Sequence, residues 1–164
     1  MQGNNRYAGY VTALLGRPNA WAVLAGSAAY PNISGVVRFY QMRNGVLVAA
    51  EASGLPADAE LCGKNILAFH IHSGGQCTGN GTDPFADAMT HYNPGNCPHP
   101  AHAGDMPPLF VNQGYAFQAF LTGRFTVREI VGKTVIIHSS TDDFTTQPSG
   151  NAGIKIACGQ IRAR

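Results

Sequence analysis

Histidines are the residues of this chain best able to do chemistry, and there are six of them. His70 and His72 lie in an apolar run, 65–72, that is typical of a strand, so both side chains point to one face with Cα atoms roughly 6.5–7 Å apart. Two imidazoles at that separation can converge on one metal ion, with bonds of about 2.0–2.1 Å. A His-x-His pair alone is a weak signal, because such pairs are common on surfaces.

A second group of potential ligands, His91, His99, His102 and Asp105, falls within 15 residues. Three imidazoles and one carboxylate are a natural set for a four-coordinate zinc ion. The alternative is a solvated loop with incidental histidines. His138 follows another apolar run, 135–137, which could deliver it to the same place. Six histidines and one aspartate make seven ligands, one short of two four-coordinate sites unless one imidazole bridges both metals.

The elements that must position these side chains are short apolar runs separated by turn residues, a pattern typical of an all-β protein. The expected strands cover residues 21–30, 36–41, 46–52, 65–72, 114–122, 134–139 and 152–162. Asn44-Gly45 predicts a hairpin, and Thr126 with Glu129 predicts a capped helical turn. Two irregular loops, 73–108 and 140–150, interrupt the strands, and long loops in small domains are usually functional. We expect a Greek-key β-barrel or sandwich of about eight antiparallel strands with two long functional loops.

Composition excludes several classes of protein. Only 12% of the 164 residues are charged, and the net charge is +2. The basic residues are scattered singly, which disfavours a nucleic-acid partner. No apolar stretch approaches the ~20 residues of a membrane helix. Apolar residues recur throughout, which excludes a disordered chain.

The four cysteines are Cys62, Cys77, Cys97 and Cys158, and none forms a Cys-x-x-Cys pair. An even count favours two disulfides, with three pairings open, although four buried thiols are the alternative. Disulfides favour an exported or cell-envelope protein, but no clear signal peptide is visible.

Five short motifs occur in series: His70-Ile-His72, His91-Tyr-Asn-Pro94, His102-Ala-Gly-Asp105, Val135-Ile-Ile-His138, and Gly150-Asn-Ala-Gly153 with Ala157-Cys158-Gly159. In order and spacing this series resembles the copper/zinc superoxide dismutase family. The match covers roughly residues 20–163, so we expect an N-terminal extension at 1–19 and one superoxide dismutase-like domain at 20–164.

The resemblance implies a role for each of these residues. It assigns copper to His70, His72, His91 and His138, and zinc to His91, His99, His102 and Asp105, with His91 bridging. Asp142 matches the carboxylate that ties the copper and zinc histidines together. Cys77 and Cys158 resemble the family disulfide, which leaves Cys62 and Cys97 as a second pair.

The implied reaction is disproportionation of the superoxide anion to dioxygen and hydrogen peroxide, with copper cycling between Cu(II) and Cu(I) and zinc structural. Lys155 stands where the family has an arginine beside the copper, and lysine keeps the charge without the planar fork of donors. Loop 140–150 is short and poor in charge, and an insertion at 83–87 has no evident role. The family pattern allows a homodimer without specifying its surface.

Two other functions compete with this interpretation. One is a non-catalytic copper/zinc-binding or copper-handling module on the same fold, but such relatives usually lack copper ligands that this chain retains. The other is a zinc-only hydrolase, which needs a general base near an open zinc position. Neither a Ser-His-Asp order nor a His-Glu-x-x-His helix is present to provide one.

Overall fold

The computed structural model of this chain describes residues 13–14, 16–59 and 63–164. Strands dominate the part of the chain that it describes. The elements are β1 (Ala20–Gly26), β2 (Ser34–Met42), β3 (Gly45–Ser53), β4 (Ile66–Leu67), β5 (Phe69–His72), the short 3-10 helix η1 (Ala86–Ala88), β6 (Leu109–Phe110), β7 (Ala116–Thr122), α2 (Val127–Ile130), β8 (Thr134–His138) and β9 (Lys155–Ala163). No described helix is long and apolar enough to span a bilayer.

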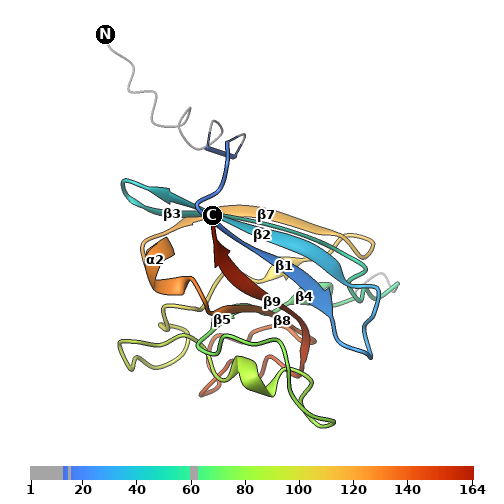
Figure 1. Cartoon of the computed structure of the whole chain (residues 1–164). Helices are drawn as coiled ribbons and strands as arrows, with labels where there is room; N and C mark the ends of the chain where they lie inside the picture. Colours follow the sequence, from blue (N-terminus) through green and yellow to red (C-terminus); the bar gives the residue numbers. More distant parts are fainter. Residues whose placement is uncertain (1–12, 15, 60–62) are drawn as a thin grey trace.

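Seven of the strands form one antiparallel sheet in the order β5-β8-β9-β1-β2-β3-β7. The sheet curls, so that β2, β3 and β7 lie on one side of the interior and β5 and β8 on the other (Figure 1). The all-β barrel or sandwich predicted from the sequence is therefore confirmed. The long loops 73–108 and 140–154 gather beyond β5, β8 and β9, away from the β2–β3 hairpin (Figure 1).

One continuous apolar core fills the interior of the curled sheet. Phe39 and Ile161 come from opposite regions of the chain and are both essentially inaccessible to solvent. The alternation of side chains along a strand explains how each strand contributes. In β7, for example, Ala116 is buried whereas Phe117 and Leu121 are exposed. Burial of this core positions the strand ends that carry the histidines.

The turn and capping motifs in the sequence predicted the ends of these elements to within a few residues. The β2–β3 hairpin turns through Arg43 and Asn44, one residue earlier than the expected Asn44-Gly45 centre. The helical turn α2 begins as predicted, since the Thr126 N–H donates to Glu129 Oε2 at 2.7 Å. Strand β1 ends at Gly26 rather than at residue 30, because the chain turns there and the Tyr30 N–H donates to Ser27 O at 2.9 Å.

Candidate metal centre

Strands β5 and β8 deliver three histidines to one face of the sheet. In β5, Phe69 and Ile71 pack in the apolar core, so the alternating side chains of His70 and His72 point the other way. Strand β8 runs antiparallel beside β5, and its last residue, His138, lies on the same face. All three imidazoles are nevertheless buried. The two long loops cover this face and shield it from solvent.

Loop 73–108 continues the hydrogen bonding along the free edge of β5. The Ile71 N–H donates to Gly104 O at 2.9 Å, and Ile71 O accepts the Tyr92 N–H at 2.8 Å. A Cβ atom at Gly104 would lie 2.2 Å from Ile71 O, so only glycine permits this approach. Because His91 and Asp105 adjoin these two tethered residues, the same hydrogen bonds place them beside β5.

The first group of potential ligands consists of His70, His72, His91 and His138, each offering one nitrogen, all within 4.8 Å of one another. His72 Nε2 lies 3.2 Å from His138 Nε2. His70 Nδ1 and His91 Nε2 are buried without a hydrogen-bond partner in the described structure. An unpartnered buried nitrogen is costly, and coordination to a metal would satisfy it. Four converging imidazoles fit copper.

The second group consists of His91, His99, His102 and Asp105, again with ligand atoms within 4.8 Å of one another. His91 Nδ1 lies 2.8 Å from Asp105 Oδ1 and 3.3 Å from His102 Nδ1. His99 Nδ1 is 3.0 Å from Asp105 Oδ2, but it lacks the alignment of a hydrogen bond and is otherwise unpartnered. Three imidazoles and one carboxylate fit a closed tetrahedral zinc site.

His91 is the residue that the two groups share. Its Nδ1 atom faces the second group, which leaves the buried and unpartnered Nε2 atom for the first. An imidazole has only these two ring nitrogens, and here each has a different set of neighbours. The ring can therefore contact two metal ions at once, which supplies the eighth ligand that the sequence count lacked.

Asp142 connects the two groups through hydrogen bonds to one histidine of each. Its Oδ2 atom lies 2.8 Å from His70 Nε2, and its Oδ1 atom lies 2.9 Å from His99 Nε2. A carboxylate that accepts both Nε2–H groups leaves the Nδ1 lone pair of each ring for a metal. Gly150 makes room for this contact, since a Cβ there would lie 1.9 Å from Asp142 Oδ1.

Burial and hydrogen bonding keep His72, His138 and the neighbouring Asp142 in the protonation states that metal binding requires. Burial lowers the pKa of His72 well below its usual value, and it lowers that of His138 to about 3, with the neighbouring histidines adding to both shifts. Burial alone would raise the pKa of Asp142, but hydrogen bonds from His70, Phe144 N–H and His99 outweigh it and lower the pKa well below its usual range. Near neutral pH these imidazoles are neutral and this carboxylate is ionised.

Loop 73–108 is fixed at its start by a disulfide between Cys77 and Cys158, which lie 81 residues apart in the sequence. Two side chains reinforce this attachment. Thr134 Oγ1 donates to Gly74 O at 3.1 Å, and Gln160 Nε2 donates to Gly75 O at 2.7 Å. The loop that carries most of the candidate ligands is thereby held to β8 and β9.

An open pocket of about 540 Å³ leads to the first group, with His72, His91 and His138 among its lining residues. Lys155, the first residue of β9, also lines it. Its ammonium donates to Asp83 Oδ2 at 2.6 Å and to Phe85 O at 3.1 Å. Lys155 thus places a cation beside the histidines.

A family model described as copper/zinc superoxide dismutase (SODC) matches residues 33–161. The chain belongs to the copper/zinc superoxide dismutase family. Superoxide dismutase (Cu-Zn) 2 of Aquifex aeolicus (strain VF5) is 34% identical over 145 residues, covering 79% of this chain and 80% of the relative. The superoxide dismutase (Cu-Zn) of Deinococcus radiodurans is 29% identical over 167 residues, covering 91% of this chain and 87% of the relative.

A solved structure, the Cu/Zn superoxide dismutase from Brucella abortus, has the same fold, with a TM-score of 0.72 over 86% of this chain and 98% of that one at 22% identity. As a member of the superoxide dismutase family, the chain is an oxidoreductase that disproportionates superoxide, with copper and zinc as its cofactors. The expectation of an enzyme is confirmed, and the comparisons do not support the non-catalytic alternative.

The structure brings together the seven ligands expected for such a superoxide dismutase, with Asp142 and Lys155 beside them. The second expected disulfide stays a prediction, because Cys62 lies outside the described residues, while Cys97 is exposed. Sequence reasoning missed Asp83, whose contact with Lys155 joins residues 72 positions apart. The insertion that contains Asp83 was the available signal.

We expect Asp142→Asn to weaken the binding of both metals by about 10- to 100-fold, as is usual when a hydrogen-bond partner of ligating histidines is lost. An amide has only one acceptor oxygen, so its NH₂ group would face the Nε2–H of His70 or His99. Competition with a chelator for zinc and for copper measures the effect. Asp143→Asn is the matched control, because among the described residues that carboxylate accepts only from Thr145 and Thr146 of its own loop. Wild-type affinities in Asp142→Asn would contradict the prediction.

Proposed function

We propose that this chain disproportionates superoxide at the two groups of ligands described above. Copper is assigned to His70, His72, His91 and His138, and zinc to His91, His99, His102 and Asp105. The observation that carries the assignment is the shared His91, whose two ring nitrogens have different sets of neighbours. When bound, copper supplies the one-electron couple that can oxidise one superoxide and reduce another.

The residues of the chain prepare the site for this chemistry. Four buried imidazoles make up the first group, and Asp142 fixes the orientation of His70. His91 Nε2 is the ring nitrogen that could hold either a metal ion of the first group or, when no metal occupies it, a proton for the peroxide product, since Nδ1 is engaged with the second group. Lys155 places an ammonium group, paired with Asp83, where a small anion enters. The second group fixes His91 and the loop that carries it.

The test is a superoxide assay on copper- and zinc-loaded protein beside His70→Ala, run with a chelator that inactivates unbound copper and with the copper–chelator complex at the same concentration as a baseline. We expect the wild type to exceed the baseline by orders of magnitude, and His70→Ala to lose copper and most of this activity while it retains zinc. His70 belongs only to the first group, which makes the loss selective. Copper-replete wild-type protein that is no faster than the copper–chelator complex would refute the proposal.

The expected homodimer and the domain boundary at residue 20 stay predictions. The exported or cell-envelope location is favoured by the Cys77–Cys158 disulfide, because such bonds persist in oxidising compartments.

A further inference from the structure

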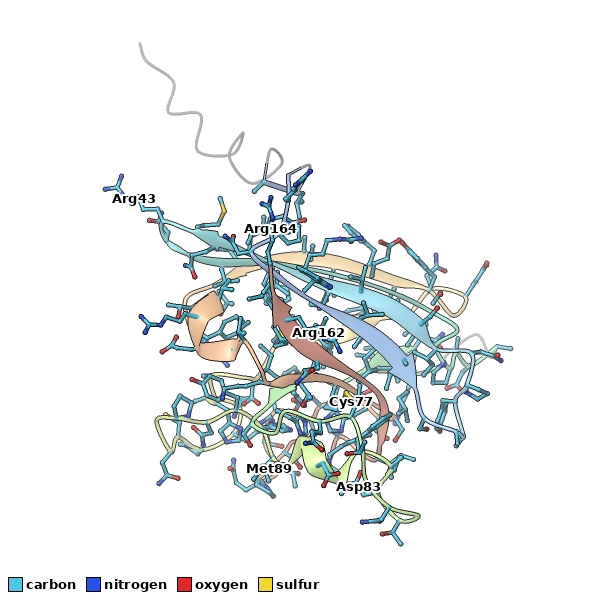
Figure 2. All side chains as sticks on the ribbon, viewed as in Figure 1. Arg43, Cys77, Asp83, Met89, Arg162 and Arg164 are labelled. Atoms are coloured by element: carbon cyan, nitrogen blue, oxygen red, sulfur yellow. A yellow bond between two sulfur atoms is a disulfide. The ribbon has the colours of Figure 1, made fainter. Side chains whose placement is uncertain are left out.

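The insertion at 83–87 is a fixed part of the pocket wall. Asn80 Oδ1 accepts the N–H groups of Thr82 and Asp83, both at 3.0 Å, which closes a tight turn. Two residues later, Phe85 is buried in a small apolar cluster with Cys158. Asp83 lies among the loops far from Arg43 and the β2–β3 hairpin (Figure 2). Turn and packing together hold the Asp83 carboxylate in a defined place.

The Asp83 carboxylate contacts the Lys155 ammonium. The Lys155 Nζ to Asp83 Oδ2 distance is 2.6 Å, and the two side chains are 14% and 38% exposed. Burial alone would raise the pKa of Asp83, but the hydrogen bond from Lys155, the Phe85 N–H and the charge of Lys155 together outweigh it, so the pKa is lowered and the group is ionised near neutral pH. A carboxylate therefore occupies one of the three donor positions of the ammonium.

The charges that line the pocket are few. Apart from histidines, Lys155 and Asp83 are the only charged side chains among the described residues that line it. Their charges cancel, so an approaching anion meets much less attraction than a free ammonium would exert. The anion must also compete with Asp83 for a hydrogen-bond donor.

We infer that Asp83 sets the anion affinity of this pocket, because its carboxylate masks the ammonium of Lys155 and so competes with the incoming anion. The inference rests on the proposed function, since superoxide is the anion concerned. It assigns the insertion at 83–87 a role in moderating substrate attraction. Asp83 acts through Lys155 and is an affinity-determining residue rather than a catalytic one.

Removing the negative charge of Asp83 should leave the Lys155 ammonium in place without a carboxylate partner. Phe85 O still accepts from Lys155 Nζ when the carboxylate is gone. An asparagine at position 83 can also retain the hydrogen bond in which Asp83 Oδ1 accepts the Phe85 N–H at 3.0 Å. The turn is therefore preserved while one negative charge is removed from the pocket.

The experiment is an azide titration of copper- and zinc-loaded Asp83→Asn and wild type, followed by the visible absorption of Cu(II) over a range of ionic strength. We expect azide to bind about fivefold more tightly to Asp83→Asn, with a steeper loss of affinity as salt is added. Asp87→Asn is the matched control, with the same charge change in the same insertion. Asp87 contacts Thr78 rather than Lys155, so its azide affinity should stay within about twofold of the wild type.

A second variant, Asp83→Ser, removes the same charge while keeping an oxygen near the Phe85 N–H, and it should act in the same direction. Unchanged or weaker azide binding in whichever of the two variants retains its disulfide and its metals overturns the inference. If Asp87→Asn gained as much azide affinity as Asp83→Asn, the inference would also be overturned, because the gain would then come from the change in net charge rather than from the contact with Lys155. Azide binding is read without turnover, so its outcome is separable from a failure of the superoxide assay.

Discussion

His91→Ala is expected to release both metals and to lower superoxide turnover by more than about a hundredfold. This effect is larger than that expected for Asp142→Asn, which removes a hydrogen-bond partner of two ligands and no ligand itself. The reason is geometric, since His91 is the member that both ligand groups share. Without its ring, the first group retains three imidazoles, and the second retains two imidazoles and a carboxylate. Metal content per chain and turnover, measured on the same preparation, give the result.

Two single-group variants provide the comparison for His91→Ala. His138→Ala removes a ligand from the first group alone, and His102→Ala removes one from the second alone. We expect the former to lose copper selectively and the latter to lose zinc selectively. If His91→Ala lost only one metal, with the other held at wild-type affinity, the bridging assignment would be wrong.

Removing the Cys77–Cys158 disulfide as Cys77→Ser/Cys158→Ser is expected to lower the free energy of unfolding by about 4 kcal/mol, from the chain-entropy estimate for a long closed loop. The bond closes a segment of 81 residues that spans the metal-binding loop. Cys158 lies in β9, so loss of the bond leaves hydrogen bonds such as Thr134 to Gly74 O and Gln160 to Gly75 O to hold the start of loop 73–108 to the sheet. Urea unfolding of the metal-free proteins, followed by circular dichroism, measures the difference.

The control for this effect is the wild type unfolded in the presence of a reductant. When both proteins are unfolded in that reductant, which would also open a Cys62–Cys97 bond, the wild type should have the midpoint of the double variant, because the two chains then differ only in sulfur and oxygen atoms. A midpoint of the double variant equal to that of the oxidised wild type would show that the bond contributes nothing to stability.

Much of the fold could be predicted from local spacing. The alternation Phe69-His70-Ile71-His72 predicted a strand with both histidines on one face, and β5 has that arrangement. The capping residues Thr126 and Glu129 predicted the single turn of α2. These signals succeed because neighbouring residues in a strand or turn determine their own hydrogen bonds.

Contacts between distant segments were harder to predict. Strands β4 and β6, of two residues each, are too short to leave a periodic signal. The Cys77–Cys158 pairing came from the family resemblance, because four cysteines allow three pairings. The contact of Asp83 with Lys155 depends on how the insertion packs against β9, and no local pattern encodes that packing.

The carboxylate of Asp142 also bears on the thermodynamics of metal loading. It holds His70 of the first group and His99 of the second, and in an ionised carboxylate the two oxygens move together. A metal that orders one ring therefore reduces the conformational entropy still to be lost at the other. Linkage is reciprocal, so whatever factor zinc adds to the affinity for copper, copper adds to the affinity for zinc. We therefore expect the two sites to fill as a cooperative pair.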